Sequence, residues 1–245
     1  DGGARPAAEG AARGLEGAQE GALGEVAGVG GGRGVAAHDG EDERLVPVDY
    51  VDPGRSLSAY DCVIVPGTKN TVEDLAALHE SGAAAEIRRA RERGVPVIGI
   101  CGGFQMLGKE IHDRGIEGGH GVYPGLGLLS AITRFARYEK TTRQVRVKAN
   151  PVGPILSAMG EVTGYEIHMG ETERGEAGEA FTGDGAVSPD GLVFGTYLHG
   201  LFQNEAAVTA LEGNWGPDEP RPVTPADRIR RGEDHGRIIE EAAAG

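Results

Sequence analysis

Cys101 stands in a sequence pattern that is suited to nucleophilic chemistry. It follows the apolar run Val97–Ile100 and precedes two glycines, Gly102 and Gly103. A buried strand, a one-residue turn and a helix start form the layout of a nucleophile elbow, here with sulfur as the nucleophile. The helix N-terminus favours the thiolate, and the N–H of Gly102 is placed to face an oxyanion. We therefore interpret Cys101 as a nucleophile, with a buried structural cysteine as the alternative.

A cysteine nucleophile needs a general base, and the chain has seven histidines. His199 ends the apolar stretch Leu192–Leu198, and parallel strands that end at one sheet edge bring their terminal residues together. His199 is therefore the first choice of base. His168 is the second choice. The other five are predicted to be solvated: His38, His79, His112, His120 and His235.

A second turn, at Gly67, closes the neighbouring apolar run that begins at Asp61. The N–H of Gly67 or Thr68 is a candidate second oxyanion donor, although a simple glycine turn explains the same residues. Cys62 lies inside that run with no turn after it. We predict that Cys62 is a small core residue.

Alternating strands and helices must position these residues. Periodicity predicts strands over 45–51, 61–67, 95–100, 144–148 and 192–198, and helices over 71–80 (with Thr71 as N-cap), 83–93, 104–111 and 204–211. This alternation predicts the α/β class, with a three-layer, open, mostly parallel sheet flanked by helices.

Composition divides the chain of 245 residues into three parts. Gly and Ala make up 23 of the first 40 residues, so residues 1–43 are predicted to be a low-complexity, disordered leader without strands. Residues 44–215 form the ordered domain. Residues 216–245 form a linker and a charged tail. Because the chain begins at Asp1, we expect it to be a fragment or a processed product.

Charge and cysteine content exclude several classes of function. A formal net charge of −14 argues against a nucleic-acid partner and against docking on anionic lipid. No apolar run approaches 18 residues, so we expect no membrane span. Two cysteines are too few for a disulfide framework. We expect a cytoplasmic protein.

Five segments, in order, resemble the class I (flavodoxin-like) glutamine amidotransferase domain, specifically its cobyric acid synthase branch. They cover about residues 45–215 and lie at 63–71, 99–108, 125–129, 164–170 and 195–202. The most specific are the Lys69-Asn70-Thr71 turn, the block Tyr165 to Gly170 and the block Leu198 to Phe202.

The resemblance implies that Cys101 attacks the side-chain amide of L-glutamine. N–H groups around Gly67 and Gly102 would hold the oxyanion, and His199 would assist hydrolysis of the γ-glutamyl thioester. In the family, the ammonia passes to a synthetase domain, which lies N-terminal to this one. That domain uses ATP and magnesium to amidate carboxylates of a corrin ring in cobalamin biosynthesis. No cofactor or metal is implied on the amidotransferase domain itself.

Two further site residues follow from the resemblance alone. Gln105 looks like the glutamine-pocket residue, and Lys140 is a weaker candidate for binding the substrate carboxylate. Many related domains carry a glutamate where this chain has Leu201. The site is then a Cys–His dyad, or it uses another acid such as Glu166.

The sequence departs from the family in two further ways. The family's opening strand is not recognisable in residues 1–43. No ATP-binding domain is present, so this chain alone is expected to hydrolyse glutamine without completing an amidation.

Other interpretations of the same residues stay open. A related amidotransferase would act on cobyrinate or on cell-wall lipid II. A catalytically silent binding module and a cysteine hydrolase or peptidase are the alternatives from other classes.

Overall fold

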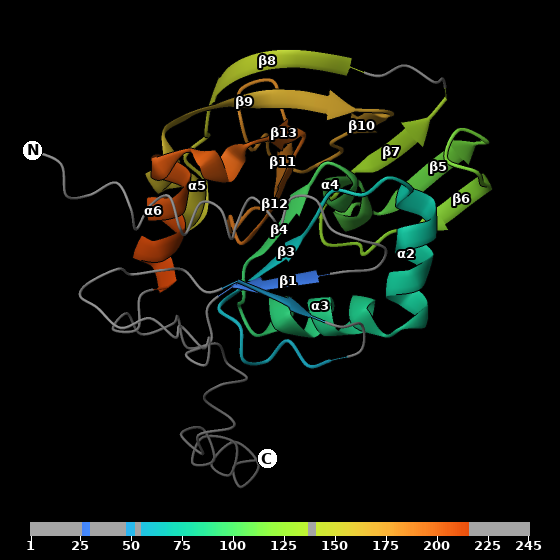
Figure 1. The fold of residues 1–245 in the computed structure, drawn as a ribbon, viewed down its shortest axis with the longest axis horizontal. Helices are drawn as coiled ribbons and strands as arrows, with labels where there is room; N and C mark the ends of the chain where they lie inside the picture. The colour runs from blue at the N-terminus through green and yellow to red at the C-terminus, as the bar shows by residue number, and fades with distance from the viewer. Residues whose placement is uncertain (1–25, 30–47, 52–54, 137–140, 216–245) are drawn as a thin grey trace, which may run out of the picture.

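The computed structural model describes residues 26–29, 48–51, 55–136 and 141–215. A six-stranded sheet at its centre has the order β11-β12-β4-β3-β1-β2 (Figure 1). The strands β3, β4 and β12 are parallel to one another, whereas β1, β2 and β11 pair antiparallel on either side of them. The bounds are β1 Val26–Val29, β2 Val48–Val51, β3 Cys62–Val65, β4 Val97–Ile100, β11 Ala186–Val187 and β12 Val193–Thr196.

Helices cover both faces of this sheet. Alternate residues of a strand point to opposite faces, and β3 divides accordingly. Cys62 and Ile64 join the core that includes α5 (Gly153–Met159) and α6 (Glu205–Trp215). Val63 and Val65 join the core that includes α2 (Thr71–Glu80) and α3 (Ala83–Glu92). The predicted three-layer α/β fold is confirmed.

Cys62 is the small core residue that the sequence predicted. Its side chain is fully buried inside β3. Burial raises the pKa of the Cys62 thiol far above its ordinary value, and the nearby charge of Asp61 raises it further. A thiol in this state is inert, because the thiolate is the reactive species.

The cap of α2 differs from the prediction. Asn70, and not Thr71, is the N-cap, because its side-chain oxygen accepts a hydrogen bond from the N–H of Glu73 at 3.2 Å. The hydroxyl of Thr71 instead donates to Oε1 of Gln105 at 3.1 Å. This bond ties the first turn of α2 to the helix that follows Cys101.

The helix predicted over 104–111 is wrong at both ends. α4 spans Gly102–Leu107, and Gly108 then takes extended backbone geometry. A Cβ at Gly108 would lie 2.7 Å from the carbonyl oxygen of Ala131, so this close approach leaves no room for a larger residue. Ile111 lies in a strand of a second, four-stranded sheet. Its order is β10-β7-β5-β6, with β5 Glu110–Arg114, β6 His120–Pro124, β7 Ile132–Phe135 and β10 Glu171–Glu173.

The strand predicted over 192–198 is divided between two sheets. β12 ends at Thr196, and the chain then enters the three-stranded sheet β13-β9-β8. Its strands are β8 Thr141–Lys148, β9 Glu161–His168 and β13 Leu198–His199. The 3-10 helix η1 (Leu201–Gln203) and α6 follow. His199 is therefore carried by a different sheet from Cys101.

The segment predicted to be a leader without strands contains β1. Val26–Val29 lies between β3 and β2 and pairs with both, so that part of the prediction is wrong. This strand has only four residues, all small or apolar, in a Gly-rich context, so it is too short for a strand period to be recognised in the sequence. The remainder of 1–43, the tail 216–245 and Lys140 lie outside the described residues.

No helix among the residues that the structure describes has the length and apolar character needed to cross a bilayer.

Candidate active site

Cys101 occupies the turn between β4 and α4 with φ 51° and ψ −111°. It is the only residue other than glycine with positive φ in the described part of the chain. Such a conformation costs about 1–3 kcal/mol and persists only where the surroundings hold it. Two glycines allow the turn: a Cβ at Gly99 would lie 2.7 Å from the backbone of Phe104, and one at Gly103 would lie 1.9 Å from the carbonyl oxygen of Val65.

Cys101 and His199 meet at one backbone oxygen. Sγ of Cys101 lies 3.4 Å from the carbonyl oxygen of Ile167, and Nε2 of His199 lies 3.1 Å from the same atom. The two side-chain atoms are therefore at most 6.5 Å apart, the sum of 3.4 and 3.1 Å. The structure brings together the two residues that the sequence singled out, although they come from different sheets.

Tyr165 shields the imidazole of His199. The two residues face each other across the β9–β13 pair, and their rings are stacked with centroids 5.7 Å apart and an interplanar angle of 6°. Tyr165 is 39% exposed, so it forms part of the surface beside the candidate site. The ring stack and the carbonyl of Ile167 together restrict how His199 is oriented.

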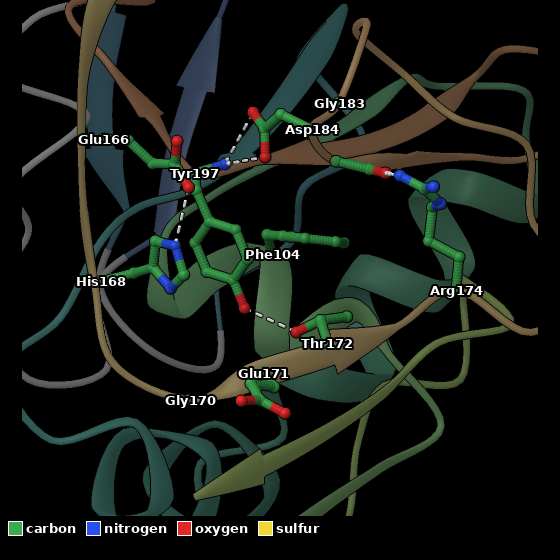
Figure 2. A pocket seen from close by; sticks show the side chains of 11 residues that line it. Phe104, Glu166, His168, Gly170, Glu171, Thr172, Arg174, Gly183, Asp184 and Tyr197 are labelled. Atoms are coloured by element: carbon green, nitrogen blue, oxygen red, sulfur yellow. Dashed lines mark hydrogen bonds and ion pairs between the residues drawn. The ribbon is translucent and has the colours of Figure 1, made fainter. Parts of the chain in front are cut away.

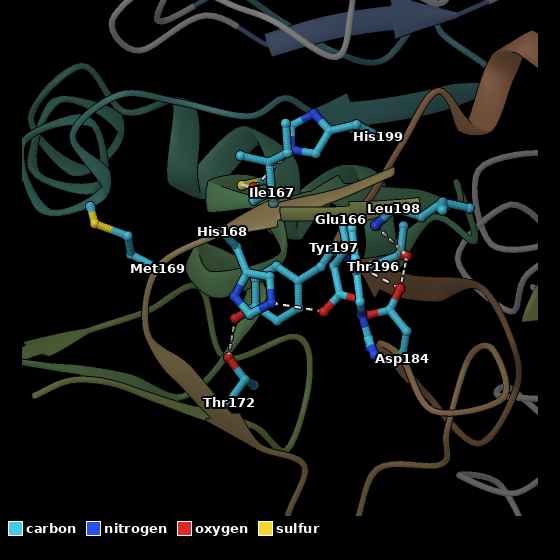
Figure 3. A network of polar contacts seen from close by, with 12 residues as sticks. Glu166, Ile167, His168, Met169, Thr172, Asp184, Thr196, Tyr197, Leu198 and His199 are labelled. Atoms are coloured by element: carbon cyan, nitrogen blue, oxygen red, sulfur yellow. Dashed lines mark hydrogen bonds and ion pairs between the residues drawn. The ribbon is translucent and has the colours of Figure 1, made fainter. Parts of the chain in front are cut away.

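Glu166 and His168 lie on the other face of β9 from His199. Alternation along a strand separates Tyr165 and Ile167 from Glu166 and His168, and Figure 3 shows His199 away from the Glu166 carboxylate. Glu166 binds Nε2 of His168 at 2.9 Å and Nε of Arg143 at 2.7 Å.

Burial works to raise the pKa of the Glu166 carboxyl, but the hydrogen bonds from Arg143 and His168 outweigh burial, and the pKa is lowered. Glu166 is therefore an ionised partner of His168. The geometry does not favour it as the missing acid of the Cys101–His199 pair.

The two predicted oxyanion turns lie against each other. A Cβ at Gly102 would lie 2.3 Å from Cγ2 of Thr68 and 3.3 Å from its backbone nitrogen. The turn after β3, which holds Gly67 and Thr68, therefore contacts the first residue of α4. Thr68 is fixed from its other side, because its hydroxyl donates to the carboxylate of Asp74 in α2. The two turns are therefore in contact beside Cys101, and the role of their N–H groups in binding an oxyanion stays a prediction.

Gln105 is buried, and its amide is engaged within the protein. Nε2 donates to the carbonyl of Met169 at 2.8 Å and to the hydroxyl of Tyr197 at 3.1 Å. Oε1 accepts from Thr71. These bonds join α4 to the β9–β10 turn and to α2, so Gln105 fixes the positions of these three segments relative to one another. Its role in binding glutamine stays a prediction.

A pocket of about 260 Å³ lies on the far face of β9 (Figure 2). Its lining includes Glu166, His168, Asp184 and Tyr197, and it includes neither Cys101 nor His199. His168 stacks on Tyr197 with centroids 3.7 Å apart. The pocket is thus a feature behind the candidate site. Within the described residues, no group of three or more His, Cys, Asp or Glu side chains is arranged to hold a metal ion.

Sequence reasoning missed Asp184, Thr196 and the carbonyl of Ile167. A backbone acceptor has no signature in a sequence, because any residue type supplies one. Asp184 sits between two glycines, which predicts only a turn. The sequence predicts Thr196 inside one continuous strand, so it does not show that the chain changes sheets directly after this residue.

The structure is that of an α/β protein in which a cysteine after the parallel strand β4 and a histidine of β13 converge on one backbone carbonyl. The chain belongs to the family of CobB/CobQ-like glutamine amidotransferase domains, which matches residues 41–207. The resemblance to glutamine amidotransferase domains of the cobyric acid synthase branch, noted in the sequence, is confirmed.

Two relatives show how the chain compares with longer proteins. It is 66% identical over 170 residues to a probable cobyric acid synthase of Methanoculleus marisnigri, a match that covers 69% of this chain and 35% of the relative. It is 49% identical over 179 residues to a cobyric acid synthase of Klebsiella pneumoniae subsp. pneumoniae, covering 68% and 35%. The match to each relative therefore spans about a third of that relative's length.

Solved structures give weaker matches. PurLQS from Thermotoga maritima is 20% identical with a TM-score of 0.49, covering 67% of this chain and 82% of that one. A glutamine amidotransferase is 23% identical with a TM-score of 0.44, covering 64% and 82%. Likenesses at this level carry no argument about the site.

Proposed function

We propose that this chain hydrolyses L-glutamine, with Cys101 as nucleophile and His199 as general base. The supporting observation is that both side chains converge on the carbonyl of Ile167, with Cys101 on a positive-φ turn between a buried strand and a helix. A strained turn of this kind at the end of a parallel strand is a common site of catalysis.

The reaction proceeds in two halves. Sγ of Cys101 attacks the side-chain amide carbon of glutamine, and N–H groups from the Gly67–Thr68 turn and from Gly102 bind the oxyanion. His199 takes the proton of the Cys101 thiol as Sγ attacks and delivers it to the departing nitrogen, and ammonia leaves. His199 then takes a proton from water, which attacks the thioester; glutamate leaves, and the thiol is restored. Gln105 and Lys140 are proposed to help bind the substrate.

We further propose that the chain is the ammonia-supplying part of a cobyric acid synthase in cobalamin biosynthesis. The identities of 66% and 49% to such enzymes support this acceptor over cobyrinate diamide or lipid II amidation. A synthetase domain in the rest of such a protein would bind ATP and magnesium and amidate corrin carboxylates. The amidotransferase domain itself needs no cofactor for thioester chemistry. A cytoplasmic setting supplies both ATP and reduced thiols.

Ammonia release from glutamine by the purified chain tests the first proposal. Cys101→Ala is expected to abolish release, because no nucleophile remains. Cys62→Ala is the matched control: it removes the other cysteine, which is buried away from the turn, and is expected to retain activity. If the wild-type chain releases no more ammonia than Cys101→Ala, it is not a cysteine glutaminase, and a catalytically silent binding module becomes the better interpretation.

The acceptor is tested separately. The chain is supplied with glutamine, ATP and magnesium in two reactions: one holds a corrin acid and the synthetase domain of a cobyric acid synthase, and the other holds lipid II and a synthetase that amidates it. Glutamine-dependent amidation of the corrin alone is expected. Amidation of lipid II alone would refute the corrin assignment and leave the glutaminase proposal intact.

A further inference from the structure

The backbone passes from the central sheet to the three-stranded sheet between Thr196 and Leu198, directly before His199. The carboxylate of Asp184 accepts hydrogen bonds from the residues at this junction. Between β12 and β13 the backbone leaves the central sheet, so its N–H groups need partners other than a neighbouring strand. The N–H of Tyr197 donates to Asp184, at 3.1 Å to Oδ1 and 3.2 Å to Oδ2. The N–H of Leu198 donates to Oγ1 of Thr196 at 3.0 Å. The Thr196 hydroxyl in turn donates to Oδ2 of Asp184.

Thr196 is linked to both members of the candidate pair. Its carbonyl accepts the N–H of Cys101 at 2.9 Å. Its hydroxyl holds the N–H of Leu198, the residue directly before His199. A single residue therefore connects the backbone at the nucleophile to the backbone at the base, and Asp184 fixes the orientation of its hydroxyl.

This junction is buried, which makes its polar bonds rigid. Thr196 is 0% exposed and Asp184 is 8% exposed. A buried hydrogen-bond donor or acceptor that loses its partner costs about 1–3 kcal/mol, so alternative arrangements of the junction are disfavoured. Figure 3 shows Asp184, Thr196 and Leu198 joined on the side of β9 away from His199. The side chains of Asp184 and Thr196 both lie away from the imidazole of His199 in this view.

We propose that Thr196 and Asp184 are positioning residues, which hold Cys101 and His199 in register through the β12–β13 junction. The proposal rests on the glutaminase function proposed above. Misplacement of reacting groups by about 1 Å is enough to cost about 100-fold in rate. A loosened junction should therefore lower kcat for glutamine hydrolysis more than it changes KM, because neither Thr196 nor Asp184 is among the residues proposed to bind glutamine.

Thr196→Val and Thr196→Ser form the central comparison. Valine has the shape of threonine without the hydroxyl, so the bonds to Asp184 and to Leu198 are lost. Serine keeps the hydroxyl and is expected to preserve most of kcat. Asp184→Asn keeps one acceptor oxygen but presents an NH₂ group in place of the second, and it is expected to lower kcat in the same direction.

The chain offers a matched control at the other end of β12. Ser188 donates to Asp190 at 2.7 Å and accepts the N–H of Val193 at 3.0 Å, the same hydroxyl–carboxylate–backbone pattern. Ser188→Ala is expected to lower thermal stability without changing kcat. A purely structural role for Thr196 would make Thr196→Val behave like Ser188→Ala.

A second measurement does not depend on glutamine. The rate of Cys101 alkylation by iodoacetamide is recorded against pH; Cys62 is fully buried and does not interfere. Imidazolium beside the thiol favours the thiolate, so loss of register should raise the pH midpoint by about half a unit or more. Thr196→Val should show this rise, and Thr196→Ser and Ser188→Ala should not.

The outcomes separate the two proposals. A fall in kcat of about tenfold or more and a raised midpoint in Thr196→Val, both restored in Thr196→Ser, support the positioning role. Wild-type kcat and midpoint in Thr196→Val would overturn it, even if the melting temperature falls. If the wild-type chain releases no ammonia, the glutaminase proposal fails, and the alkylation midpoints alone decide whether the junction holds Cys101 beside His199.

Discussion

Replacing Gly103 by alanine tests whether contact between α4 and the end of β3 holds the Cys101 turn. The added Cβ would lie 1.9 Å from the carbonyl oxygen of Val65 and 2.8 Å from that of Pro66. Real Cβ atoms essentially never approach within 3.0 Å, so the start of α4 and the end of β3 must separate by at least 1.1 Å, the difference between 3.0 and 1.9 Å. Both opposing atoms are backbone, so no side-chain rotation relieves the contact.

The expected effect of Gly103→Ala is large on activity and moderate on stability. Overpacking of this kind costs about 1–3 kcal/mol, which corresponds to a fall in melting temperature of roughly 2–12 °C for a domain of this size. Cys101 lies two residues before Gly103 and moves with the helix start. A displacement near 1 Å should lower kcat for glutamine hydrolysis by about 100-fold.

Gly213→Ala is the control for this substitution. Gly213 lies exposed in α6, and an added Cβ meets nothing within 4 Å. Alanine there should stabilise the protein by about 0.5–1 kcal/mol, because glycine is the weaker helix former, with kcat unchanged. If Gly103→Ala keeps both its melting temperature and a kcat within twofold of wild type, the close contact does not fix the turn, and the reasoning is refuted.

Three further predictions concern the base, the core cysteine and the buried acid. His199→Ala should lower kcat by about 100-fold or more, whereas His168→Ala should act mainly on the melting temperature through the lost stack on Tyr197; equal kcat losses would contradict our choice of base. Cys62→Ser buries an unmatched hydroxyl and should lower the unfolding free energy by about 1–3 kcal/mol, measured by urea titration, with kcat preserved. Burial raises the pKa of the Asp184 carboxyl above its ordinary value of 3.8, against hydrogen bonds from Thr196 and Tyr197 that lower it. Its contribution to stability is therefore fully present below pH 3.8 and is lost as pH rises through the raised pKa. Urea titrations should show that the difference in unfolding free energy between wild type and Asp184→Asn becomes smaller as pH rises. A constant difference would contradict the raised pKa.

The sequence predicts the convergence of Cys101 and His199 better than it predicts the path of the chain around them. The sequence singles out Cys101 and His199 because each follows an apolar run. Both side chains do reach the carbonyl of Ile167, although His199 lies on antiparallel β13 and not at the end of a parallel strand. The bounds of α2 followed from its period and polar start, as the structure confirms. These features are local, so a single sequence shows them.

The errors arose where tertiary contacts override local pattern. Apolar residues from Phe104 to Ile111 suit a helix period, yet the close approach at Gly108 ends α4 and starts a strand. The run from Leu192 to Leu198 looks like one strand, yet the buried carboxylate of Asp184 supplies the bonds that let it change sheets. Neither partner is near in sequence, so neither effect is visible there.

The position of β1 has a consequence for how the domain is isolated. A shortened chain beginning at residue 41, where the family match begins, would lack Val26–Val29. Because β1 lies between β3 and β2 and pairs with both, β3 would then present a bare row of N–H and C=O groups. Unprotected edges of this kind pair with other molecules. Self-association of the shortened chain, seen as concentration-dependent mass by light scattering, would therefore report on a missing strand and not on a native dimer.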